Sequence, residues 1–328
     1  MSHIHTLQCS NTLTEKGMEH ELRISQCIKP HLNLRLMRGL LGLTSSSKTG
    51  PLPPSKYYLL WDDNTVNFSS TILQLRTEYS PDDYAELVLI CLVQFFAALQ
   101  HLYTNGICHR DVGLESIYVT RVDEHWLIKL GNFRFALHHP GPVSATSFVY
   151  GYHELEWLGG ANCSLPPEVI DTPENAQTID YSHTDSFASG CLIYEMLGLR
   201  NPFEKNVELV YHQYAEANLP QINCGSKYDE HFHHLAALLV KRDPSKRLSA
   251  STALLICETL LWLPHFWLKE TISENHIRYH LELEHAALLS EIAERNKDHI
   301  PLPLLLKAKF LLNCNISKLS QALSLFKK

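Results

Sequence analysis

Five short runs contain the polar side chains that could carry chemistry in this chain. Asp111 is one of the carboxylates among them. Magnesium is bound in proteins largely through carboxylates and substrate phosphates, so such a carboxylate could take part in phosphate chemistry. Each run alone is a weak signal, whereas all five in this order and at these spacings form a specific pattern. The runs are residues 108–111 (Cys-His-Arg-Asp), 131–134 (Gly-Asn-Phe-Arg), 166–168 (Pro-Pro-Glu), 185–190 (Asp-Ser-Phe-Ala-Ser-Gly) and 242–247 (Arg-Asp-Pro-Ser-Lys-Arg).

The first two runs must be positioned by a long apolar helix and two strands. Ser80 can cap a helix and Pro81 suits its first turn, so we expect a helix over residues 80–103. It is apolar nearly all round, which predicts deep burial. Residues 117–120 and 126–130 read as strands. The first run therefore follows a buried helix, and the second follows a strand.

The rest of the chain is mostly helical in pattern. A short helix is expected over residues 15–27 and a strand over residues 56–61, while residues 138–167 are rich in turns. Beyond them, helices are predicted over residues 185–197, 207–217, 229–240, 250–261, 276–293, 302–312 and 316–326.

The five runs and these elements resemble the C-terminal lobe of a protein kinase over roughly residues 57–268. The resemblance implies an α+β, mainly α fold, with a protein-kinase-like C-lobe, a reduced N-lobe and a C-terminal helical extension. Residues 1–56 would form an N-terminal segment with a partial N-lobe. Residues 57–268 would be the kinase-like domain. Residues 269–328 would be the extension, a candidate dimerisation module.

The resemblance assigns Asp111 to the catalytic-loop position that orients the substrate hydroxyl. It also exposes two departures at the metal-binding positions. Ser116 stands where a kinase has its metal-binding Asn, and Asn132 replaces the Asp of the Asp-Phe-Gly motif. Arg134 replaces the Gly of that motif and adds a positive charge. The catalytic position is therefore present but degenerate, and neither metal nor Mg-ATP is expected to bind.

The positions that hold a kinase lobe together are kept. Glu168 and Arg247 match its buried ion pair, and Asp185 matches the acid that accepts backbone donors from the catalytic loop. His109, Arg110 and Phe133 complete these structural positions, His109 and Phe133 as the lower half of the hydrophobic spine. Structural residues remain while metal and phosphate ligands are lost, which favours a pseudokinase.

The N-lobe shows the largest gap. No G-x-G-x-x-G and no V-A-I-K motif precedes the catalytic loop, and Lys29, Lys48 and Lys56 lack the strand context of the phosphate-pairing lysine. Residues 28–42 look like the segment after the N-lobe helix, so the chain is expected to begin inside that lobe. Tyr118 occupies the position that floors the adenine pocket, where it could fill the pocket or simply pack in the core.

The segments 192–203 and 260–262, together with the catalytic loop and the helical tail, look like the PEAK/pragmin pseudokinases. That resemblance implies a catalytically inactive signalling scaffold that forms homo- or heterodimers through helices flanking the lobe.

The last predicted helix has one apolar face at spacings of three and four. This face could dock on the lobe or on a partner. The resemblance favours the partner, which makes Ile316, Leu319, Leu323 and Phe326 candidate interface residues.

An active or weakly active kinase that uses Asp111, in an N-terminally truncated chain, is the alternative. A module that binds nucleotide without transferring phosphate is a lesser one. A full N-lobe with a phosphate loop would favour the active-kinase alternative.

Composition limits the other classes of function. The 328 residues have a formal net charge of −7, which argues against nucleic acid as a partner. Nine scattered Cys fit reduced thiols in the cytoplasm. No secretory signal or membrane span is expected, because the apolar stretch over residues 87–99 is too short. Partners are therefore expected to be proteins.

Three weaker motifs remain. Pro51 to Lys56 matches an SH3-ligand pattern, although a plain loop fits as well. The His pair 138–139 and the His residues at 231, 233 and 234 lack carboxylate or Cys neighbours at ligand spacing, so no metal site is predicted. Tyr150 and Tyr152 lie where an activation segment could be phosphorylated.

Overall fold

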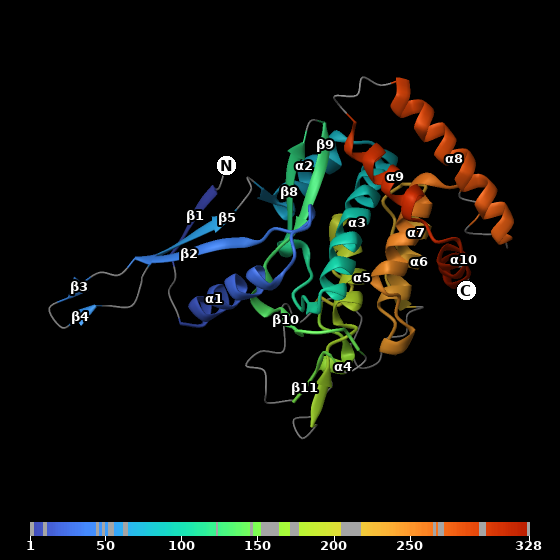
Figure 1. Ribbon diagram of the computed structural model, residues 1–328. Helices are drawn as coiled ribbons and strands as arrows, with labels where there is room; N and C mark the ends of the chain where they lie inside the picture. The colour runs from blue at the N-terminus through green and yellow to red at the C-terminus, as the bar shows by residue number, and fades with distance from the viewer. Residues whose placement is uncertain are drawn as a thin grey trace.

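The computed structural model shows the expected α+β, mainly α architecture, with a small sheet layer on one side of a helical lobe and three helices on the other (Figure 1). The structure describes residues 3–8, 12–43, 46–47, 50–51, 56–61, 65–122, 124–144, 147–151, 164–170, 177–204, 218–264, 267, 272–294 and 300–326.

The N-terminal layer is a three-stranded antiparallel sheet with one helix. Strand β5 (Lys56–Trp61) lies in the middle, between β1 (His3–Gln8) and β2 (Met37–Leu43). Helix α1 (Thr12–Cys27) packs against β2. The predicted helix and the strand over residues 56–61 are confirmed. Strand β1 was missed, because six residues of mixed polarity carry no clear period of their own.

A second three-stranded sheet leads into the catalytic-loop region. It contains β6 (Val66–Asn67), β8 (Ile117–Val122) and β9 (His125–Leu130), and a bridge from Leu34 to Leu130 links it to the N-terminal segment. Strands β3 (Ser46–Ser47) and β4 (Gly50–Pro51) form a separate hairpin.

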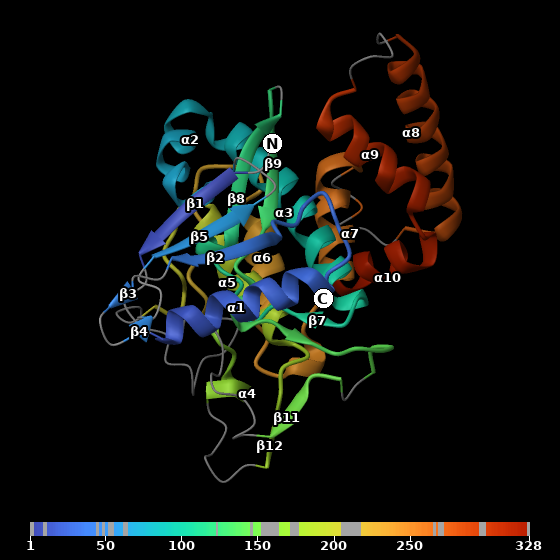
Figure 2. The ribbon, with the colours of Figure 1, turned by 60° about the vertical axis from the view of Figure 1, so that its left-hand side comes forward.

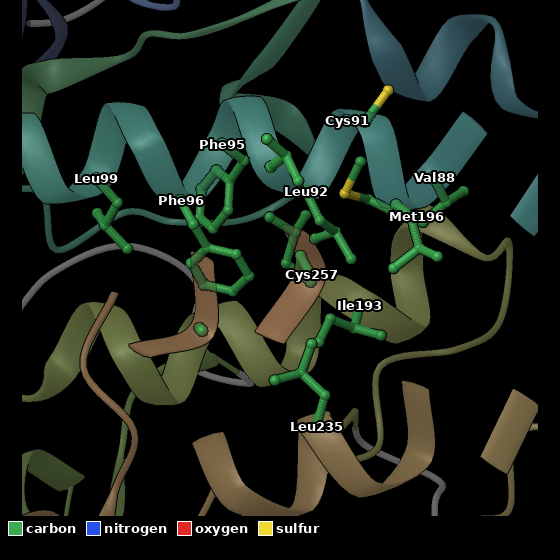
Figure 3. Packing of buried hydrophobic residues seen from close by; sticks show 14 of the residues in the cluster. Val88, Cys91, Leu92, Phe95, Phe96, Leu99, Ile193, Met196, Leu235 and Cys257 are labelled. Carbon is green, nitrogen blue, oxygen red and sulfur yellow. The ribbon is translucent and has the colours of Figure 1, made fainter. Parts of the chain in front are cut away.

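Helix α3 (Pro81–Thr104) is the centre of the lobe. The Ser80 hydroxyl caps it by accepting the Asp83 N–H at 3.2 Å. Its side chains share one buried cluster with those of α5 (Thr184–Met196), α6 (Asp229–Leu239) and α7 (Ala250–Trp262), and Figure 3 shows part of that cluster. Among the described residues α3 is the one helix long and apolar enough to cross a membrane, but 72% of its most apolar window is buried. That burial is what a core helix requires.

Short elements complete the lobe, and the predicted helix over residues 207–217 lies outside the described residues. The remaining bounds are α2 (Ile72–Glu78), β7 (Ile107–Cys108) paired with β10 (Leu137–His138), β11 (Val149–Gly151) paired with β12 (Thr178–Asp180), α4 (Pro167–Ile170) and the 3-10 turns Phe68–Ser70, Leu114–Ser116, Phe133–Phe135 and Pro244–Lys246.

The C-terminal extension contains α8 (Glu274–Glu294), α9 (Leu302–Asn313) and α10 (Ile316–Phe326). Figure 2 shows the three helices together on the side of the lobe away from the N-terminal sheet. Helix α10 contacts α6, α7 and α8. The extension is thus packed onto the lobe through its last helix.

The assignment of the last helix's apolar face to a partner is wrong for these residues. Leu319, Leu323 and Phe326 are buried within the chain, and the half-buried Ile316 packs against the same core. Helical spacing shows that one face is buried but not what covers it, and here the covering surface belongs to the same chain.

Candidate functional site

Asp185, in the first turn of α5, holds the loop that follows β7. Its carboxylate oxygens accept the N–H groups of His109 and Arg110, each at 2.7 Å. Arg110 has a φ of +62°, a conformation that costs a non-glycine residue free energy and needs surrounding support. Asp185 supplies that support and so fixes the direction in which Asp111 points.

The side chain of Asp111 is engaged by its own neighbours. Asn132 donates its Nδ2–H to Asp111 Oδ2 at 2.7 Å, and Arg134 donates from Nε and Nη2 to the same oxygen at 3.3 Å. The Asp111 side chain is 10% exposed. Burial raises the pKa of Asp111, and the Arg134 charge opposes that rise. The carboxylate that would orient a substrate hydroxyl is therefore paired internally.

The two degenerate metal positions also lie together. Asn132 Nδ2 is 3.3 Å from Ser116 Oγ, and the Ser116 hydroxyl donates to the backbone carbonyl of Asp111 at 2.5 Å. Asn132 is in the left-handed region, with φ of +66°. Hard cations such as Mg²⁺ prefer anionic oxygen ligands, and this cluster contains one carboxylate with a guanidinium beside it. The donor set present does not fit a divalent cation.

Among the described residues no group of three His, Cys, Asp or Glu side chains could hold a metal. Two histidines of α6 instead contact α10: His234 Nε2 hydrogen-bonds the carbonyl of Phe326, and the His231 ring stacks on the Phe326 ring.

A stack of three side chains lies where the resemblance places the adenine. The guanidinium carbon of Arg35 is 3.9 Å from the ring centroid of Trp61 and 4.1 Å from that of Tyr118. Arg35 is 4% exposed. A Cβ at Gly131 would lie 3.1 Å from the Tyr118 ring and 3.2 Å from Arg35, so a glycine is needed for this close approach.

Of the two readings left open for Tyr118, the ring does pack, and it packs against a buried cation at the adenine floor. Sequence reasoning missed Arg35, and its one signal is a charged residue within the apolar run of residues 34–37.

Glu21 on α1 is a second residue that sequence reasoning missed. In kinases a Glu of the N-lobe helix pairs with a Lys on the preceding strand, but β1 contains no Lys. Here Glu21 Oε1 accepts the N–H of Phe133 at 3.1 Å, and burial raises the pKa of Glu21 to about 7. The helix is thereby tied directly to the segment that carries Asn132.

The raised pKa of Glu21 predicts a pH-dependent stability. The unfolded chain releases this proton near pH 4.5 and the folded chain near pH 7. The contribution of Glu21 to the free energy of unfolding should therefore fall by about 3 kcal/mol as pH rises through that window, in addition to the fall that Glu258 causes up to about pH 8. Glu21→Gln should remove the Glu21 part of the slope and leave the Glu258 part, making the variant equal to the parent at pH 4.5 and more stable at pH 8. Urea denaturation at several pH values measures this. The exposed neighbour Glu19, changed to Gln, is the control, and an unchanged slope in Glu21→Gln would contradict the prediction.

The structural positions lie where a kinase lobe needs them. His109 Nε2 is 2.9 Å from the carbonyl of Gly131, and its ring meets that of Phe133 edge-on at 5.1 Å. Arg247 Nη2 donates to Glu168 Oε2 at 2.7 Å, as one arm of a bidentate pair, and its guanidinium lies over the Phe187 ring. Tyr150 is half-buried on β11, whereas Tyr152 and most of the segment from Pro51 to Lys56 lie outside the described residues.

Comparisons with known proteins agree with this geometry. A family model described as the protein kinase domain matches residues 53–256. The inactive tyrosine-protein kinase PEAK1 of Homo sapiens is 28% identical over 232 residues, covering 67% of this chain and 13% of that protein. The inactive tyrosine-protein kinase PRAG1 of Mus musculus is 26% identical and covers 66% of this chain and 18% of its own length. The mitochondrial serine/threonine-protein kinase PINK1 of Homo sapiens is 29% identical, covering 78% and 43%.

A crystal structure of the pseudokinase PEAK1 matches the fold with a TM-score of 0.74 at 24% identity, covering 98% of this chain and 81% of that one. The chain spans 13% and 34% of the lengths of the first curated relatives that it matches.

Proposed function

The chain belongs to the protein kinase domain family, and we propose that within this family it is a pseudokinase that acts as a signalling scaffold through protein–protein contacts. The observation that carries the proposal is the closed cluster around Asp111, in which Asn132 and Arg134 occupy the carboxylate. The stack of Arg35 between Trp61 and Tyr118 supports it, because it puts a buried cation against Tyr118, the residue that the resemblance places at the floor of the adenine pocket.

Phosphoryl transfer depends on positioning the phosphates and cancelling their charge. A base with no positioned phosphoryl donor has nothing to act on. PEAK1 and PRAG1 are named inactive kinases, while PINK1 is named a kinase. An active kinase that uses Asp111 is therefore the second candidate, favoured by the retained carboxylate and by the similarity to PINK1.

We expect ATP to leave the melting temperature unchanged within about 1 °C, with or without Mg²⁺ or Mn²⁺. A ligand present at 100 times its dissociation constant adds about 2.7 kcal/mol of stability, which would shift the transition by several degrees. Asn132→Asp should not restore binding or phosphate transfer, because Arg134 and the Arg35 stack remain. Differential scanning fluorimetry and a radiolabelled phosphate-transfer assay measure the two effects. A metal-dependent shift of several degrees, or transfer that Asp111→Asn abolishes, would favour the active-kinase candidate.

The scaffold proposal includes assembly with a second copy or a related pseudokinase, in the cytoplasm. Helix α8 supports it because the helix is apolar on two sides. Ile277, Leu281 and Leu288 face the chain's interior, while Tyr279 and Leu283, one turn apart, are 58% and 48% exposed. An ordinary surface helix has one apolar face, so the outer face of α8 replaces the four α10 residues as the candidate interface.

Leu283→Asp is expected to weaken self-association at least tenfold, because it puts a charge in place of an apolar side chain in the interface. A tenfold loss corresponds to about 1.4 kcal/mol of association free energy. Because the Leu283 side chain is exposed, the substitution should have little effect on folding. Light scattering at tens of micromolar, with circular dichroism to confirm the fold, measures it. Leu73→Asp on α2 is the matched control, since Leu73 is 75% exposed outside the extension. A parent chain that is monomeric at this concentration would rule out the homodimer.

A further inference from the structure

A cavity of about 730 Å³ lies between the kinase-like lobe and the extension. Its walls come from α3, α7, α9 and α10, and it shares no residue with the cluster around Asp111. Leu254 and Leu255 of α7 and Leu306 and Phe310 of α9 supply apolar walls. The volume is within the range of sites for small organic ligands, which are mostly apolar with a few convergent polar groups.

Glu258 on α7 is the carboxyl group that the lobe presents to this cavity. Its side chain belongs to a residue that is 9% exposed, and it lines the cavity wall. Within the described part of the chain its carboxyl makes no hydrogen bond or ion pair. A buried carboxylate without a partner is costly, and burial raises the pKa of Glu258 to about 8. No described residue of the chain therefore supplies the cation or hydrogen-bond donor that the ionised form of Glu258 needs.

The other polar groups around the cavity do not fill that role. Lys309 is exposed, and its charge acts on Glu258 without an ion pair forming between them. His31 and His101 stack at 4.7 Å, and burial lowers the pKa of His31 to about 4, so that ring is neutral at pH 7. Burial raises the pKa of Cys314 to about 12, so this thiol is neutral as well. The buried titratable groups of the cavity wall are thus acidic or neutral, while its lysines, Lys309 and Lys318, are exposed.

We propose that this cavity is a binding site for a small organic amine, whose ammonium group pairs with Glu258 and whose apolar body lies against Leu254, Leu306 and Phe310. An ammonium donates hydrogen bonds to the carboxylate and thereby favours the ionised form of Glu258, which burial disfavours. The apolar body displaces water from the aliphatic walls. Because the ligand contacts both α7 and α9, its binding joins the lobe to the extension.

The test is a calorimetric titration of the full chain at pH 7.5 with three probes of equal length: n-hexylamine, n-hexanol and n-hexanoate. Hexylamine should bind about tenfold more tightly than hexanol, as expected for a hydrogen bond to a charged group. Glu258→Gln should abolish this preference and leave the hexanol affinity within about twofold, since the apolar walls are unchanged. Equal affinities for amine and alcohol in the parent chain, or an amine preference that survives in Glu258→Gln, would overturn the proposal.

A second variant keeps the proposal testable if Glu258→Gln does not fold. Ala97 on α3 lines the cavity and is half-buried, so Ala97→Phe should fill the space and weaken hexylamine binding while Glu258 is intact. Unchanged binding in this variant would place the amine elsewhere and contradict the assignment. Tighter binding of hexanoate than of hexylamine would assign the cavity to anions held by Lys309 and Lys318, which also overturns the amine proposal.

Discussion

Replacing Glu168 with Ala is expected to lower the free energy of unfolding by about 3–5 kcal/mol. The variant leaves the guanidinium of Arg247, whose side chain is 0% exposed, without its bidentate acid. The backbone carbonyls of Lys241 and His183 accept hydrogen bonds from that guanidinium but cannot neutralise it. A typical domain has only about 5–15 kcal/mol of stability, so the loss would be a large fraction of the total.

Urea denaturation followed by circular dichroism measures the change. The matched control is the pair between Lys246 and Asp243, in which the Lys246 side chain is 68% exposed. Lys246→Ala should change the stability by less than about 1 kcal/mol, because exposed pairs contribute little. If Glu168→Ala melts within a degree of the parent protein, the ion pair does not tie the segment of α4 to the lobe.

Truncating Leu323 to Ala should cost about 2–5 kcal/mol, the range for a large-to-small change in a packed core. Leu323 is 2% exposed and belongs to the same core cluster as the side chains of α3 and α7. A partner-facing Leu would give a much smaller effect in the isolated chain. The result therefore distinguishes an α10 that is packed into the core of its own chain from an α10 that is exposed for a partner.

The control for this variant is Leu312→Ala on α9, where the side chain is 70% exposed. Surface changes of this kind usually stay within about 0.5 kcal/mol. Thermal unfolding of the two variants at equal concentration gives the comparison. Equal losses in both variants, or no loss in Leu323→Ala, would show that α10 is not part of the cooperative core.

The C-lobe could be predicted from the sequence because its signals are short and local. The cap at Ser80, the apolar helix that follows the cap and the two strands that come after residues 108–111 all depend on neighbours in the chain. The ion pair of Glu168 with Arg247 was inferred from motif order, although 79 residues separate the partners.

The contents of the site could not be predicted in the same way. Arg35 meets Trp61 and Tyr118 only after three separate segments fold together, and no spacing encodes that contact. Glu21 reaches Phe133 across 112 residues for the same reason. The apolar face of α10 could be read from the sequence, but the surface that buries it could not.

The stack of Arg35 between Trp61 and Tyr118 also determines how this protein responds to the chemical tools used to study kinases. Inhibitors and affinity resins built on adenine mimics need an open slot between the two lobes. Here a buried guanidinium fills that slot between two aromatic faces, and displacing it would require removing a charge from its packed surroundings. If the chain is the pseudokinase that we propose, proteome surveys that capture kinases on such resins are expected to pass over it. Compounds aimed at it would have to be designed around the arginine rather than around the nucleotide.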